Sequence, residues 1–439
     1  MSDRIVRLDR REFLAGLGAA TIAPNLPGIA SAQGRSRLLL QASAARQALG
    51  SGESPIWSLQ GLPPPSAPRL RRGDELDIAF ENKLPVATVL NWHGLDGLRA
   101  AEPLTARQPV APGGKENLTI SLRQAGTFLC DLRLLGDGLA LPSPAQPLIV
   151  AESEPVAVDR DEVFLIEDWR LRPDGTPIAP GLDPTDTPPI YTVNGQIMPD
   201  IPARTHERIR IRFINACQRA VVAVKIDMPE VRVMALDGEP AEPFPARNGA
   251  IVLAPGGRAD TFIDVSTAAG SSTPILLHDG GEARPIGRLV VSGKFPLRKE
   301  GLPPASPLPP NGPPAHIDLK GALRFEVTLG GPAQTYWVTT AKFATSAAPA
   351  FRAKSGRTVV LALSNRGGAP MVFHLHGHHF RLLDRLDDGW KPFWLDTLAI
   401  DSGQTQRVAF LASHSGAWLM EAMATDWVAP RLLRWYSVA

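Results

Sequence analysis

The sequence predicts an all-β protein built from three β-sandwich domains. Apolar and polar residues alternate in many short runs, for example residues 75–80 and 208–214, and this period of two is typical of strands with one buried face. The 439 residues include 39 glycines and 43 prolines, which favour frequent turns over long helices. The alternating runs fall into three blocks of similar length, and at ~100–200 residues per domain the chain has room for them.

The three blocks give the predicted domain boundaries. The first domain covers residues 36–153, the second residues 154–300 and the third residues 316–439. Residues 301–315 are rich in proline. They cannot form a helix or an inner strand, so we expect an extended linker there.

Residues 1–32 predict a cleaved export signal and not a part of the fold. Arg10 and Arg11 precede an apolar run over residues 14–22, and Ala30-Ser31-Ala32 offers a cleavage site of small residues. This order resembles a twin-arginine signal. The apolar run is too short to span a membrane, so we expect a periplasmic protein whose mature chain has no transmembrane segment.

Charge and cysteine content limit the functions to be considered. The net charge is +2, from 46 basic and 44 acidic residues, so no nucleic-acid partner is implied. The two cysteines are Cys130 and Cys217. In an oxidising compartment they could form a disulfide, or they could be two separate buried thiols, and the sequence leaves both alternatives open.

Short motifs in all three blocks resemble the multicopper oxidase family. The first block contains Asn91-Trp92-His93-Gly94-Leu95 and a second motif at residues 126–133, and the third contains His374-Leu375-His376-Gly377-His378 and residues 416–423. Residues 193–196 and 253–260 resemble the middle domain of that family. The resemblance implies three cupredoxin-like Greek-key β-sandwiches.

The resemblance also implies a set of copper ions. In the family, a type 1 copper in the third domain is bound by Cys, two His and often Met, and a trinuclear cluster between domains one and three is bound by eight histidines. Those histidines come in His-x-His pairs, since residues i and i+2 of a strand point to the same face. Imidazole and thiolate suit copper.

Transferred to this chain, that pattern keeps few ligands. The type 1 positions hold a set of side chains that together cannot hold a redox copper: Met371, Ala422, Trp427 and Leu432. At the trinuclear positions the retained histidines are His93, His374 and His376. Other trinuclear positions hold Asn91, Asp131, Arg133, Glu421 and Met423. We therefore expect no full copper set.

Two interpretations fit the charged replacements Asp131, Arg133 and Glu421. In the first, Arg133 bridges the two carboxylates and joins domains one and three, because a guanidinium can bind carboxylates with paired hydrogen bonds. In the second, His93, His374 and His376 bind a single Cu, Zn or Fe together with a carboxylate. An arginine beside the site opposes a metal ion, so the first is preferred. His378 and His379 are interpreted as surface or packing residues.

Two functional hypotheses follow. The first is a non-catalytic periplasmic scaffold that binds protein partners. It resembles the copper-free, twin-arginine-exported branch of the family, whose known member protects the cell-division apparatus under stress. The alternative is a metal-dependent oxidoreductase, with copper as the expected metal. Its reduced site would lie between domains one and three, at His93, His374 and His376.

Overall fold

The computed structural model describes residues 34–50, 52–61, 69–184, 186–228, 230–332, 336–384 and 389–439. The predicted export signal, residues 1–32, lies outside the described residues. Across these ranges the chain forms β-strands and four short 3-10 helices without an α-helix, which confirms the predicted all-β class. No helix in the described ranges is long and apolar enough to cross a membrane.

The first block contains two four-stranded sheets. One has the spatial order β2 (Gly52–Gln60), β1 (Arg35–Leu49), β4 (Glu75–Asn82) and β6 (Lys115–Ser121). The other has the order β3 (Arg69–Arg71), β8 (Gln146–Ala151), β7 (Gly126–Asp131) and β5 (Asn91–His93). Two 3-10 helices lie in this block, η1 (Arg99–Ala101) and η2 (Arg133–Leu135).

The second block contains a six-stranded and a five-stranded sheet. The larger has the order β10 (Ile190–Val193), β9 (Arg160–Trp169), β12 (Arg208–Asn215), β17 (Arg258–Asp264), β14 (Val231–Leu236) and β15 (Glu239–Pro245). The smaller has the order β11 (Asp200–Ala203), β19 (Arg284–Val291), β18 (Ser272–His278), β13 (Val222–Ile226) and β16 (Ala250–Leu253). The 3-10 helix η3 (Arg247–Gly249) precedes β16.

The third block again contains two sheets. One has the order β20 (Leu323–Leu329), β23 (Arg357–Asn365), β27 (Thr405–Ala412) and β25 (Arg381–Leu382). The other has the order β21 (Val338–Thr339), β29 (Leu432–Val438), β28 (Gly416–Ala424), β24 (Met371–Leu375) and β26 (Thr397–Ile400), and β22 (Arg352–Ala353) also pairs with β29. The 3-10 helix η4 (Thr340–Lys342) follows β21.

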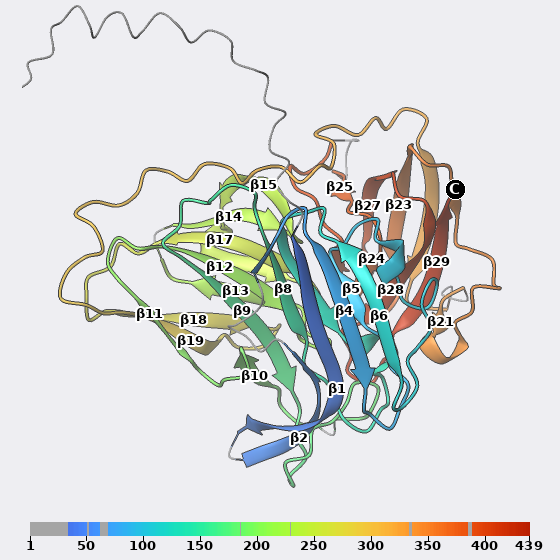
Figure 1. Cartoon of the computed structure of the whole chain (residues 1–439), viewed down its shortest axis with the longest axis horizontal. Helices are drawn as coiled ribbons and strands as arrows, with labels where there is room; N and C mark the ends of the chain where they lie inside the picture. Colours follow the sequence, from blue (N-terminus) through green and yellow to red (C-terminus); the bar gives the residue numbers. More distant parts are fainter. Residues whose placement is uncertain are drawn as a thin grey trace, which may run out of the picture. The chain divides into compact units, whose positions relative to one another are not determined.

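The three blocks repeat one topology. Each has a parallel pair in one sheet, namely β1 with β4, β9 with β12, and β20 with β23. Each has a second parallel pair in its other sheet, namely β3 with β8, β11 with β19, and β22 with β29. Parallel neighbours require a crossover connection, so the chain passes between the two sheets of each sandwich. Figure 1 shows these strands in blue to cyan, green to yellow, and orange to red.

Each block has its own apolar core. The three largest clusters of buried apolar side chains lie within residues 38–150, 164–291 and 327–438. Strand β4 shows the expected pattern, with every second side chain buried, because one face of its sheet packs on the first core. The domain boundaries themselves stay predictions.

Strand β12 differs from the half-buried strand predicted for it. All of its residues are buried, because its polar face packs against neighbouring charges and the first block. Arg210 Nη2 lies 2.5 Å from Asp260 Oδ2, and Arg212 Nη1 donates to Thr127 Oγ1 of β7 at 2.8 Å. Arg210 also pairs with Glu152 at the end of the first block, at 2.8 Å. One ion pair and one hydrogen bond therefore join the first two blocks, and both arginines are buried.

Candidate functional site

The candidate site lies where two strands of the first block face two strands of the third. Asn91 on β5 is paired with Asp131 on β7, and His374 on β24 is paired with Glu421 on β28. The two halves meet directly, since Asn91 Nδ2 donates to Glu421 Oε1 at 3.1 Å. The sequence-predicted residues therefore do converge between these two blocks, with Arg133 as the exception described below.

His376 is held between two carboxylates. Its Nε2 lies 2.7 Å from Glu421 Oε1, and its Nδ1 lies 3.2 Å from Glu102 Oε1. Glu102 directly follows η1, and it is fixed by the backbone N–H of Leu419, which donates to Oε1 at 2.8 Å. Burial lowers the pKa of His376, but the two carboxylates outweigh burial and raise that pKa to about 10. At neutral pH His376 is therefore an imidazolium that donates from both nitrogens.

Arg431 supplies the positive charge beside Glu421. Its Nη1 donates to Glu421 Oε2, and both side chains are buried. Burial raises the pKa of Glu421, but Arg431 and His376 outweigh it and hold that pKa well below its usual value. The sequence motifs did not indicate Arg431 or Glu102. The available signal for Arg431 was its place beside Leu432, which pairs with Ala422 next to Glu421.

His93 and Asp131 form a second polar contact. His93 Nε2 lies 3.1 Å from Asp131 Oδ2. Burial raises the pKa of Asp131, but the hydrogen bond and charge of His93 outweigh burial and lower that pKa. Among the described side chains, His93 Nδ1 and Asn91 Oδ1 are buried without a hydrogen-bond partner. The cavity that adjoins His93 and Asp131 measures about 20 Å³, which is room for about one water molecule.

Arg133 does not bridge Asp131 and Glu421, so that expectation is wrong. Strand β7 ends at Asp131, whose Oδ1 accepts from the backbone N–H of Arg133 at 2.9 Å, and the chain turns into η2. The strand rule that places i and i+2 on one face therefore does not apply. The Arg133 guanidinium donates to the carbonyls of Ser143 and Ala216, and to Glu167 Oε1 at 3.0 Å.

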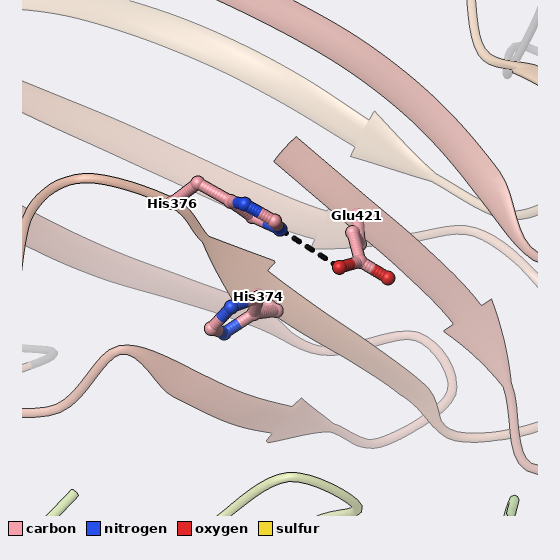
Figure 2. Close-up of side chains that lie close together, drawn as sticks. All are labelled: His374, His376 and Glu421. Atoms are coloured by element: carbon pink, nitrogen blue, oxygen red, sulfur yellow. Dashed lines mark hydrogen bonds and ion pairs between the residues drawn. The ribbon is translucent and has the colours of Figure 1, made fainter. Parts of the chain in front are cut away.

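His374, His376 and Glu421 form the tightest group of metal-ligating side chains among the described residues. One ligand atom from each lies within 4.8 Å of the others. Figure 2 shows His374 and His376 side by side, with His376 contacting Glu421. His374 Nδ1 lies 2.9 Å from Thr397 Oγ1. Burial and the neighbouring His93 hold the pKa of His374 well below its usual value, so it is a neutral imidazole.

Comparison with known proteins places this chain in a family. Models described as "Multicopper oxidase" match residues 42–130 and residues 316–436. A crystal structure of a multicopper oxidase from Pseudomonas thermotolerans superposes with a TM-score of 0.78 at 25% identity, covering 93% of this chain and 100% of that chain. The chain belongs to the multicopper oxidase family.

Two relatives that align with most of this chain carry different names. Multicopper oxidase MmcO of Mycobacterium tuberculosis is 24% identical over 79% of this chain and 76% of its own length. Cell division protein FtsP of Pectobacterium atrosepticum is 25% identical over 94% of both chains. A solved structure, Lac15 from a marine microbial metagenome, is 27% identical with a TM-score of 0.74, covering 92% of this chain and all of that chain.

Of the four positions that the sequence resemblance assigned to a type 1 copper, three lie in apolar surroundings. Met371, Ala422 and Leu432 belong to the core cluster of the third block. Trp427 lies elsewhere: its Nε1 donates to the Ala179 carbonyl at 3.2 Å. The guanidinium carbon of Arg170 lies 5.0 Å from the Trp427 ring centroid. This tryptophan therefore packs against the second block.

Two further histidines of this multicopper oxidase family member, His378 and His379, are buried, and so are both cysteines. His378 Nδ1 lies 2.7 Å from the Tyr436 hydroxyl, and His379 Nδ1 lies 2.8 Å from Asp96 Oδ2. Both are packing residues and neither is at the surface. Cys130 and Cys217 are buried free thiols, so they do not form a disulfide in this structure.

Proposed function

We propose that this protein is a non-catalytic member of the multicopper oxidase family that acts as a periplasmic scaffold without the copper set. One observation carries the proposal: the atoms of His376 and Glu421 that would bind a metal are engaged by other residues. Both nitrogens of His376 face carboxylates, and Glu421 is paired with Arg431. A metal ion needs a neutral imidazole, so it would have to displace a proton and an arginine.

The donor set also does not fit the coppers. A type 1 copper needs a thiolate, and the position that the family gives to it is the buried Ala422. Of the trinuclear positions, Asp131 is engaged with His93 and Asn91 with Glu421. The cavity beside these side chains measures about 20 Å³, which is room for about one water molecule.

The relatives support a partner-binding role in cell division. The relative named Cell division protein FtsP aligns over 94% of both chains. The proposed partners are therefore periplasmic proteins of the division apparatus, and the proposed route to that compartment is twin-arginine export directed by residues 1–32. The balanced net charge of +2 favours protein partners over a nucleic acid.

Metal quantification on natively exported protein tests the proposal. We expect copper, zinc and iron each well below one per chain, and no strong blue absorbance. A copper-loaded multicopper oxidase purified in parallel controls for loss of metal during preparation. Copper at one or more per chain, lost in the His374→Ala/His376→Ala variant, would overturn the proposal.

A deletion strain separates the scaffold role from any metal chemistry. Without the gene, we expect a septation defect, which the wild-type chain and the His374→Ala/His376→Ala variant rescue equally. A version lacking residues 1–32 is expected to fail because it stays in the cytoplasm. Rescue by the wild-type chain alone, with the variant folded and present in the periplasm at the wild-type level, would show that the histidines are needed and would contradict the scaffold role.

A second candidate is a metal-dependent oxidoreductase with a single ion, and one observation favours it. His374, His376 and Glu421 place their ligand atoms within 4.8 Å of one another, a donor set that suits Cu, Zn or Fe. When bound, such an ion would supply Lewis-acid or one-electron chemistry. The same metal quantification decides between the two candidates.

A further inference from the structure

A cavity of about 400 Å³ lies between the first block, the proline-rich linker and the third block. This cavity is lined by other residues than the candidate functional site, because none of His93, His374, His376 and Glu421 lines it. Its volume falls in the range of about 300–1,000 Å³ that is typical of small-molecule sites. Its apolar lining includes Trp394, Leu411 and the wall formed by Pro313 and Pro314.

The linker wall of this cavity is held in place by hydrogen bonds. Asn311 is buried, and its Nδ2 donates to the carbonyls of Ala125 at 2.6 Å and Gly238 at 3.1 Å. Its Oδ1 accepts from the Ala125 N–H at 2.9 Å. Arg72 donates to the carbonyls of Pro310 and Asn311 at 2.9 and 3.2 Å. Because this wall is already fixed, less conformational entropy is lost when a ligand binds against it.

The charges around the cavity sum to a positive value. Asp96 is the lining carboxylate, and its Oδ2 lies 2.8 Å from His379 Nδ1. Burial lowers the pKa of His379, but Asp96 outweighs burial and raises that pKa to about 10, so the two form a neutral pair. Arg72 and Arg123 also line the cavity, and both are exposed. Within the described part of the chain, neither guanidinium forms an ion pair with a carboxylate.

We propose that this cavity is a binding site for a small aromatic monocarboxylate. The ring of the ligand would lie against Trp394 and the Pro313–Pro314 wall, and the carboxylate would bind Arg123 at the solvent side. A guanidinium matches a carboxylate in geometry and charge. Arg72 is committed to backbone carbonyls, including that of Arg123 at 2.9 Å, so it positions the site and adds to its positive potential.

Isothermal titration with benzoate tests this site, on protein treated with a chelator so that no metal ion can bind the carboxylate. The result is therefore independent of the metal content that the proposed function concerns. We expect benzoate to bind at least about tenfold more tightly than its neutral analogue benzamide. Arg123→Gln should weaken benzoate binding about fivefold to tenfold, and Arg352→Gln, an exposed arginine outside the cavity, should leave it unchanged.

A second variant locates the site without changing a charge. Ser413 is exposed and lines the cavity, so Ser413→Phe should fill it and abolish binding without disturbing the core. No heat of binding for benzoate up to about 10 mM would overturn the proposal. Equal affinity for benzamide, unchanged affinity in Arg123→Gln, or binding retained in Ser413→Phe would each overturn it too.

Discussion

Glu421 and Arg431 form a buried ion pair at the point where the third block faces the first. Glu421 also accepts hydrogen bonds from Asn91 of the first block and from His376. One carboxylate thereby connects two blocks. Removing its guanidinium partner would leave a buried carboxylate with too little positive charge around it.

Arg431→Met is therefore expected to destabilise the protein strongly. Breaking a buried pair by removing one partner costs about 3–5 kcal/mol, and a urea titration measures the loss. Adding Glu421→Gln to Arg431→Met should recover part of the stability, because the uncompensated charge is then absent. The exposed Arg352→Gln serves as the matched control. A loss below about 1 kcal/mol in Arg431→Met would contradict a buried ion pair.

Double-mutant cycles distinguish the partners of the two arginines. Arg133 contacts Glu167 and not Glu421, so we expect a coupling of about 1–3 kcal/mol for Arg133→Met with Glu167→Gln. For Arg133→Met with Glu421→Gln we expect less than about 0.5 kcal/mol. A large coupling in the second cycle would restore the bridge that the sequence suggested and the structure lacks.

Glu239 makes stability depend on pH. Burial raises the pKa of Glu239 to about 7, from an ordinary value of 4.5. Between these values the folded protein binds the proton and the unfolded chain has released it. Stability therefore falls as the pH rises through this window.

Glu239→Gln should remove this contribution to the dependence of the free energy of unfolding on pH. Its Oε1 can still accept from Gln124 Nε2, which lies 2.7 Å from Glu239 Oε1. Urea titrations at about pH 5 and about pH 8 measure how far the free energy of unfolding falls between these two pH values. That fall should be roughly 1–3 kcal/mol smaller in the variant than in the wild type. The exposed Glu326→Gln is the matched control. An unchanged slope in Glu239→Gln would refute the raised pKa.

Both thiols are expected to be unreactive in the folded protein. Burial raises the pKa of Cys130 and of Cys217 well above the usual value, and thiolates are the reactive form. A chromogenic disulfide reagent should therefore detect no thiol in the native protein and both thiols after denaturation without a reductant. Failure to detect them in denaturant would indicate a disulfide.

The sequence by itself determined the all-β class and the family. It predicted, through the resemblance, which side chains stand at the copper-ligand positions. The alternation of apolar and polar residues in β4 was sufficient to predict a strand, because one face of that strand packs on a core and the other meets solvent. The motifs around His93 and His374 were sufficient to predict that these residues lie on strands of the first and third blocks. Within each motif the residues keep a fixed register with the neighbouring strand. Ala422 is a non-ligand by its chemistry alone, because a methyl side chain offers no donor atom.

Only the tertiary structure decided which charges meet. Arg133 turns away because β7 ends at Asp131, and strand ends depend on long-range pairing that local pattern does not specify. Glu102 reaches the site from the first block, and Arg431 reaches Glu421 from the connection between β28 and β29. Ion pairs form between side chains that the packed sheets bring within about 4 Å, and in a buried site such distances decide which carboxylates and histidines are charged.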